Sequence, residues 1–150
     1  MFVGIDVAKD RLDVHVRPAG ESFVVARDGE GIEELARRLS AVTPTLVVLE
    51  ATGGFETVVA AGLAAAGLPV AVINPRQIRD FARATARLAK TDTLDAAVIA
   101  HFAEAVNPPV RLLADPQQRL LGELMARRRQ LIDMMVAEGN RRRLLTARRT

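Results

Sequence analysis

Two acidic residues stand in or beside apolar runs within the first 50 residues of this chain. Asp6 lies inside the apolar run 2–7, and Glu50 directly follows the apolar run 46–49. A charged side chain in such a setting costs free energy unless another group compensates for it. The two positions are therefore candidates for a site that uses carboxylate chemistry.

A second acidic pair occurs in the segment 90–96, where Asp92 and Asp95 are three residues apart. If the segment is helical, this spacing places both carboxylates on one face. Like charges so close together are unfavourable unless a cation compensates for their repulsion. The alternative is a capping pattern, in which Thr91 or Asp92 starts the helix and Asp95 lies in its first turn. The residues alone leave both interpretations open.

Together the four carboxylates predict a site for a hard divalent cation. Oxygen ligands are those that Mg²⁺ prefers, with Mn²⁺ as a substitute. Two such ions can activate a hydroxyl and stabilise a leaving oxygen in phosphoryl transfer. The predicted catalytic and metal-binding residues are Asp6, Glu50, Asp92 and Asp95.

The order of predicted elements favours an α/β fold with a mixed sheet. Strands are predicted at 2–7, 12–16, 22–26, 46–49 and 69–73, and helices around 32–39, from Gly54 to Gly67, at 78–88 and at 93–106. The first three strands form an antiparallel meander. A right-handed crossover would place the fourth strand parallel to the first, so that Asp6 and Glu50 meet at one edge.

Composition excludes several classes of protein. The chain has 150 residues, of which 49% are hydrophobic, enough for one domain and an appendage. It has no cysteine, which excludes disulfides and thiolate zinc sites, and aromatic residues make up only 3%. No apolar run resembles a signal peptide or a membrane helix, so we expect a cytoplasmic protein without a membrane partner.

The basic charge is concentrated near the C-terminus. Residues 111–150 hold ten basic and four acidic side chains, a net charge of +6. Apolar positions recur at helical spacing from about 115 to 148, which predicts one long amphipathic helix and a coiled-coil partner, hence a homodimer or higher homo-oligomer. The expected division is a domain at 1–110 and a helical segment at 111–150. Whether the arginines form a solvated face or contact a polyanion stays open.

Other basic residues lie near the predicted carboxylate site. Lys9 and Lys90 are the only lysines, and each is a few residues from a carboxylate. Arg76, Arg79 and Arg83 repeat at spacings of three and four along one predicted helix. These five residues are the predicted nucleic-acid contacts, although a solvated face would give the arginines the same spacing.

Three segments resemble the N-terminal domain of the DEDD insertion-sequence transposases, a family that includes the Piv-type DNA invertases. They are Gly4-Ile5-Asp6-Val7-Ala8-Lys9, Glu50-Ala51-Thr52-Gly53-Gly54 and Lys90-Thr91-Asp92-Thr93-Leu94-Asp95-Ala96. The resemblance implies a RuvC-like, RNase H-type fold and an acidic tetrad at the four carboxylates that binds Mg²⁺ for DNA strand cleavage and exchange. It also implies dimerisation through the helix and, in some members, a guide noncoding RNA.

The chain departs from the family pattern in one respect. Family members continue into a C-terminal domain with a nucleophilic serine, whereas Ser22 and Ser40 are the only serines here and neither matches that role. We therefore expect a fragment that binds metal and does not recombine DNA by itself. The alternatives are a Holliday-junction-resolvase-like nuclease and a noncatalytic nucleic-acid-binding dimerisation module. An actin-like ATPase or sugar kinase is disfavoured, because the hairpin after Asp6 lacks glycine.

Overall fold

The computed structural model describes residues 1–85, 95–111 and 116–147. The chain divides into two compact units, Met1–Leu113 and Ala114–Thr150, which are described separately. In the first unit a five-stranded sheet has the order β3-β2-β1-β4-β5. This mixed sheet with helices confirms the predicted α/β class.

Three strands near the N-terminus form the predicted antiparallel meander. They are β1 (Phe2–Val7), β2 (Arg11–Arg17) and β3 (Glu21–Ala26). Along β2, Leu12, Val14 and Val16 are almost completely buried and alternate with more exposed residues. Alternation of this kind puts one face of a strand into the core and leaves the other for polar groups. Asp13, on that second face, pairs directly with Asp6 of β1.

The remaining strands run parallel to β1. They are β4 (Leu46–Glu50), which pairs with β1, and β5 (Val70–Ile73), which pairs with β4. All five residues of β4 are buried, as its continuous apolar sequence predicts for a strand covered on both faces. The predicted parallel placement of the fourth strand beside the first is thus confirmed.

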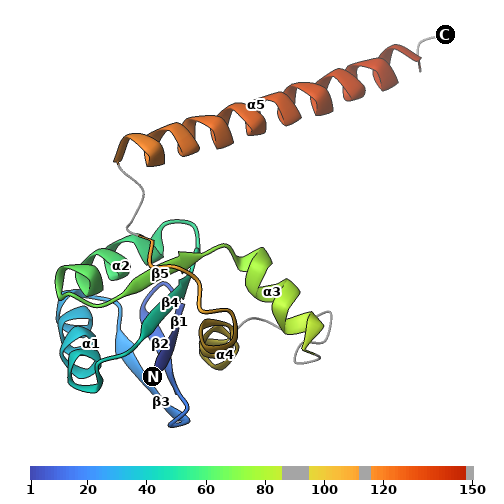
Figure 1. Ribbon diagram of the computed structural model, residues 1–150. Helices are drawn as coiled ribbons and strands as arrows, with labels where there is room; N and C mark the ends of the chain where they lie inside the picture. The colour runs from blue at the N-terminus through green and yellow to red at the C-terminus, as the bar shows by residue number, and fades with distance from the viewer. Residues whose placement is uncertain (86–94, 112–115, 148–150) are drawn as a thin grey trace. The chain divides into compact units, whose positions relative to one another are not determined.

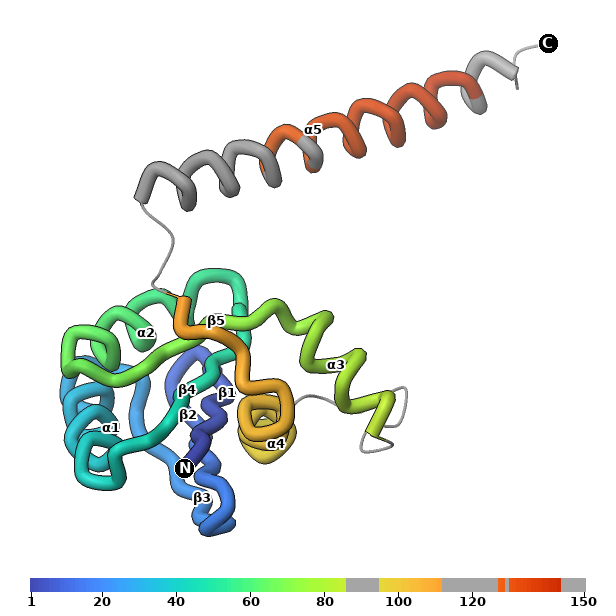
Figure 2. Tube along the Cα trace, in the orientation of Figure 1, coloured from blue at the N-terminus to red at the C-terminus, as the bar shows by residue number. Residues whose placement is uncertain are grey.

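Helices cover both faces of the sheet (Figure 1). On one face lie α1 (Gly29–Val42) and α2 (Phe55–Ala65), and on the other α3 (Pro75–Ala84) and α4 (Ala96–Val106). Figure 2 allows the same layers to be followed along the Cα trace. Burial of apolar side chains in the two layers provides the main stabilisation of this unit.

A glycine in β1 permits the close approach of α4. A Cβ atom built on Gly4 would lie 2.2 Å from the Ala100 backbone nitrogen and 2.3 Å from the Ala96 carbonyl oxygen. Because backbone atoms cannot move aside as a flexible side chain can, any larger residue would displace the helix. Gly4 therefore fixes the position of the α4 N-terminus relative to β1.

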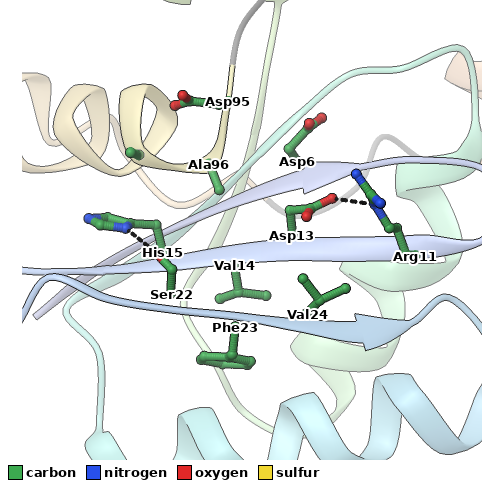
Figure 3. Close-up of a pocket in the computed structure, with 11 residues that line it drawn as sticks. Asp6, Arg11, Asp13, Val14, His15, Ser22, Phe23, Val24, Asp95 and Ala96 are labelled. Carbon is green, nitrogen blue, oxygen red and sulfur yellow. Dashed lines mark hydrogen bonds and ion pairs between the residues drawn. The ribbon is translucent and has the colours of Figure 1, made fainter.

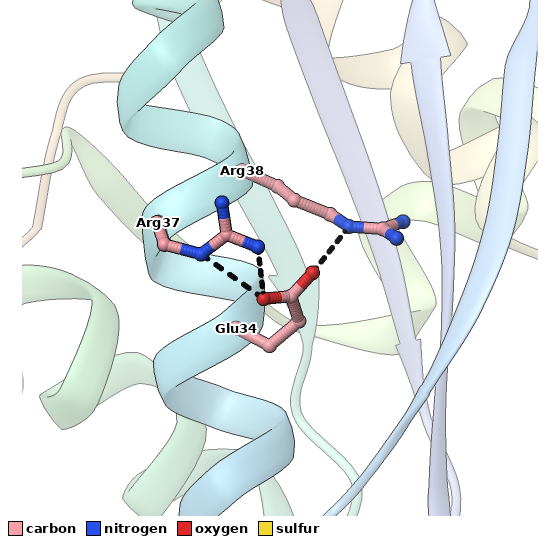
Figure 4. A network of polar contacts seen from close by, with 3 residues as sticks. All are labelled: Glu34, Arg37 and Arg38. Carbon is pink, nitrogen blue, oxygen red and sulfur yellow. Dashed lines mark hydrogen bonds and ion pairs between the residues drawn. The ribbon is translucent and has the colours of Figure 1, made fainter.

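The outer surface of α1 carries a local network of charges (Figure 4). Glu34 accepts hydrogen bonds from the Nε atoms of Arg37, at 3.1 Å, and Arg38, at 2.7 Å. These bonds hold the pKa of Glu34 below its usual range. The Arg38 guanidinium also lies 4.9 Å above the Phe23 ring of β3. Both arginines thus have local partners on this surface.

The second unit contains the helix α5 (Pro116–Ala147), within the range for which the sequence predicts a long helix. Several of its apolar side chains are exposed, among them Leu131, Met134, Met135 and Val136. Within the described residues, no helix combines the length and hydropathy that crossing a bilayer requires.

Candidate functional site

Two carboxylates meet where β1 and β4 end. Because Ile5 pairs with Leu49 in parallel register, the next residues, Asp6 and Glu50, lie side by side. Burial raises the pKa of Asp6, and the charges of Asp13 and Asp95 raise it further. Burial also raises the pKa of Glu50, and the charge of Asp6 raises it further. The two groups therefore share a partly desolvated and negatively charged site.

Asp95 joins this site from the start of α4. It is the N-cap residue, with φ −121° and ψ 169°, and its side chain accepts a hydrogen bond of 2.8 Å from the Val98 backbone nitrogen. Both interpretations of the segment 90–96 place Asp95 within a helix, and both are wrong on this point, because the helix begins only at Ala96. Capping one of the free N–H groups of the first turn favours this start. Asp92 and Lys90 lie outside the described residues.

The predicted basic stripe lies on α3. This helix starts after Asn74, whose side chain accepts a hydrogen bond of 2.9 Å from the Arg76 nitrogen. Arg79 interacts with the site, since its charge lowers the pKa of Glu50 and opposes the effect of burial. Arg83 is 3.7 Å from Asp80 of the same helix. Of the three predicted arginines, Arg79 is thus the one whose charge acts on a carboxylate of the site.

The two loops that follow β1 and β4 are linked by Arg27. Its Nε atom donates a hydrogen bond of 2.6 Å to the carbonyl of Lys9, in the turn after β1. Its guanidinium lies 4.7 Å above the Phe55 ring, at the start of α2. Lys9 itself is exposed, in the turn that follows β1.

Glu56 organises the glycine loop after Glu50. Its Oε2 atom accepts hydrogen bonds from the backbone nitrogens of Thr52, at 3.0 Å, and Gly54, at 2.9 Å. Gly53 and Gly54 have φ values of 76° and 112°, in the left-handed region that favours glycine. These glycines thus form the turn between β4 and α2.

An open groove of about 410 Å³ extends from Asp6 and Asp95 over β2 and β3 (Figure 3). Arg11 and Asp13 line it beside Asp6, and Arg11 Nε is 3.0 Å from Asp13 Oδ2. Sequence reasoning missed both residues. The alternation along 12–16 already places Asp13 on the polar face, but its pairing with Asp6 depends on the hairpin register.

The donor set suits a hard cation. The described residues hold no group of three or more acidic or histidine side chains close enough to enclose a metal ion. Nevertheless, burial raises the pKa of both Asp6 and Glu50. The charge of Asp95 also raises the pKa of Asp6, and the charge of Asp6 raises that of Glu50. A divalent cation would compensate both for the cost of burying these charged carboxylates and for their mutual repulsion. The chemistry of these residues therefore fits a hard divalent cation.

Removing one of these charges is expected to stabilise the metal-free chain. A raised carboxyl pKa means that the folded state binds the proton more tightly than the unfolded state. The ordinary pKa is 3.8 for Asp6 and 4.5 for Glu50. The contribution of each group to the stability of the fold is therefore lost as the pH rises from this ordinary pKa through the raised pKa of the folded state. We expect Asp6→Asn and Glu50→Gln to raise the free energy of unfolding at pH 7 by about 1 kcal/mol or less, because both groups lie at the edge of the sheet, where solvent screens their charges.

Urea unfolding at pH 3 and pH 7, in the presence of a chelator, measures this effect. The difference from the unmodified chain should be present at pH 7 and should vanish at pH 3. Asp10→Asn, in the exposed turn after β1, serves as the control and should change neither value. Equal stabilities of the variants and the unmodified chain at pH 7 would contradict the prediction.

Comparison with known proteins gives three findings. A family model of the DEDD type, described as "Transposase", matches residues 3–147. The pilin gene-inverting proteins of Moraxella lacunata and Moraxella bovis are each 25% identical over 151 residues, which covers 97% of this chain and 47% of theirs. The chain thus spans about half the length of these relatives.

The solved structure of RuvC from Thermus thermophilus is similar in fold. The superposition has a TM-score of 0.50 and 19% sequence identity, and it covers 73% of this chain and 98% of that chain. This likeness supports the RNase H-like arrangement of the sheet and helices that the sequence predicts.

Proposed function

The chain belongs to the DEDD transposase family, and from this premise we propose that residues 1–110 form the Mg²⁺-dependent catalytic domain of a DNA recombinase. The family and the RuvC-like fold support an enzyme domain that acts on DNA. The observation that carries the proposal is the convergence of Asp6, Glu50 and Asp95, from two strand ends and one helix start, on a single negatively charged site.

In this proposal Asp6, Glu50, Asp92 and Asp95 hold the cation, with Mn²⁺ able to replace Mg²⁺. When bound, the metal would supply electrostatic stabilisation for a phosphodiester under attack. Asp6 and Glu50 keep their orientation because β1 and β4 pair in fixed register. The cap bond to the Val98 nitrogen orients Asp95 in the same way.

The basic residues near this site would bind the DNA backbone. Lys9 and Lys90 flank the carboxylates in sequence, and Arg76, Arg79 and Arg83 lie along α3. Arg79, whose charge acts on Glu50, would bring a phosphate toward the site. Contacts of this kind position DNA without reading its sequence.

Residues 111–150 are proposed to assemble copies of the chain. Exposed apolar residues of α5, such as Leu131 and Met135, would pack in a homodimeric or larger coiled coil. A guide noncoding RNA, which the family resemblance implies for some members, is a further proposed partner. The net charge of +6 over residues 111–150 would favour contact with any polyanion. By itself the 150-residue chain is expected to bind metal and nucleic acid without exchanging DNA strands.

Titration with Mn²⁺ or Mg²⁺ by calorimetry tests the metal site. The unmodified chain should bind the ion, and Asp6→Asn and Asp92→Asn should each weaken binding by about 100-fold, since each removes a charged oxygen ligand. Asp133→Asn makes the same chemical change on exposed α5 and should leave the affinity unchanged. No binding by the unmodified chain would contradict a preformed metal site.

A noncatalytic nucleic-acid-binding module is the second candidate. It is favoured by the lack, among the described residues, of a cluster ready to enclose a metal ion. It predicts no metal binding in the titration and a salt-dependent affinity for nucleic acid through residues 111–150. The two functions therefore predict opposite results for the unmodified chain.

A further inference from the structure

We infer that the Arg11 guanidinium binds the phosphodiester on which the carboxylate site acts. The inference rests on the proposed function and adds a substrate-binding residue from a different element. Neither the transposase resemblance nor the predicted basic stripe includes Arg11, which is the first residue of β2.

The position of Arg11 follows from the hairpin register. Arg11 and Asp13 lie on the same face of β2, and Asp13 is paired directly across from Asp6. Figure 3 shows the three side chains together at one end of the groove. A phosphate held at the carboxylate site would therefore lie near Arg11.

Asp13 holds Arg11 in this place without using all of its donors. The ion pair joins Arg11 Nε to Asp13 Oδ2 at 3.0 Å. Arginine has five N–H donors, so this bond does not use the four on the two Nη atoms. The Arg11 side chain is 66% exposed, which makes these donors accessible. A planar guanidinium oriented by a carboxylate is well suited to two phosphate oxygens.

The groove continues from Arg11 along β2 and β3, beside the first residues of α4. His15 and Ser22 lie there as cross-strand partners, with His15 Nδ1 2.7 Å from Ser22 Oγ. Val24, also in the groove, is 57% exposed. Polar donors beside an exposed apolar side chain suit a nucleic-acid strand that leaves the site over this face.

The charges of the groove make phosphate binding depend on a cation. Among the described residues, three carboxylates, those of Asp6, Asp13 and Asp95, line the groove with the guanidinium of Arg11. Without a divalent ion this arrangement repels a phosphodiester. Binding in the groove should therefore require metal, whereas binding by the basic residues 111–150 should not.

The affinity of the full 150-residue chain for a short fluorescent DNA duplex tests the inference. It is measured in Ca²⁺, which has the same preference for oxygen ligands, and in a chelator, at several salt concentrations. For Arg11→Ala we expect an affinity about tenfold lower in Ca²⁺ and unchanged in the chelator, with the salt slope reduced by about one. Arg11→Lys should recover part of the affinity, because lysine keeps the positive charge but lacks the paired N–H donors of the guanidinium.

Arg37→Ala is the matched control, because Arg37 is 73% exposed and pairs with Glu34 on α1. It should leave the affinity in Ca²⁺ unchanged. The affinity of Arg11→Ala for Mn²⁺, measured without DNA, should equal or exceed that of the unmodified chain, since a positive charge is removed from beside Asp6.

Three results would overturn the assignment. An unchanged DNA affinity of Arg11→Ala in Ca²⁺ would show that Arg11 does not bind the phosphodiester. An equal loss with and without Ca²⁺ would reduce its role to general electrostatic attraction. Failure of the unmodified chain to bind Mn²⁺ would overturn the proposed metal site and this inference together. The first two results, in contrast, would overturn the role of Arg11 and leave the metal site standing.

Discussion

Asp6→Asn is expected to reduce metal-dependent DNA cleavage at least a thousandfold in any polypeptide that contains residues 1–150 and cleaves DNA. Asp6 is adjacent to Glu50, and its charge interacts with those of Asp13 and Asp95. It therefore lies at the centre of the carboxylate site. Its replacement by a neutral amide removes a ligand charge from the proposed metal site. A thousandfold loss corresponds to about 4 kcal/mol of transition-state stabilisation, within the range that a metal ion supplies.

Nicking of supercoiled plasmid in Mg²⁺ or Mn²⁺ measures this effect. Asp10→Asn is the control, since Asp10 is an exposed aspartate only four residues away. The Asp6 variant should stay folded, because its metal-free form is expected to be at least as stable as the unmodified chain. Cleavage by Asp6→Asn at a rate within tenfold of the unmodified chain would remove Asp6 from the catalytic centre. Loss of cleavage in Asp10→Asn as well would mean that the effect is not specific to the site.

The part of the site formed by β1 and β4 could be predicted from the sequence. Asp6 and Glu50 are charged residues in or beside apolar runs, and the crossover rule makes the two strands parallel neighbours. The observed register, with Ile5 opposite Leu49, is the one that brings the carboxylates together. Here local pattern and connection handedness were sufficient, because both carboxylates belong to the strands themselves.

The contribution of α4 could be predicted only in part. The segment 90–96 contains several residues able to cap a helix, and spacing does not distinguish among Thr91, Asp92 and Asp95. The structure begins the helix after Asp95, whose side chain caps the Val98 nitrogen. The proximity of Asp95 to Asp6 also requires α4 to pack against β1 at Gly4, a tertiary contact between segments about 90 residues apart.

Arg11 and Asp13 were missed for a different physical reason. Alternation along β2 identifies the polar face of the strand, yet many strands have a polar face that simply contacts water. Only the hairpin register reveals that Asp13 lies opposite Asp6. Arg11 comes to the site with Asp13, because the two side chains are paired along the same strand. A short turn restricts the register without fixing it, so cross-strand neighbours remain ambiguous until the backbone is known.

Gly4→Ala is expected to destabilise the fold by about 3 kcal/mol, since its Cβ would overlap the α4 backbone and overpacking of a closed core has this order of cost. For a chain of this size the corresponding decrease in Tm is roughly 6–12 °C. Gly29→Ala is the matched control, because a Cβ at Gly29 meets no atom within 4 Å, and its Tm should be unchanged or higher. Thermal unfolding followed by circular dichroism compares the two variants directly.

The same substitution links the packing of α4 to the site. Relief of the overlap requires α4 to move away from β1, which carries Asp95 away from Asp6. Gly4→Ala should therefore bind Mn²⁺ more weakly than Gly29→Ala at a temperature where both variants are folded. A destabilised Gly4 variant with unchanged Mn²⁺ affinity would show that the metal site does not depend on the seating of α4. An unchanged Tm would contradict the close approach of β1 and α4 itself.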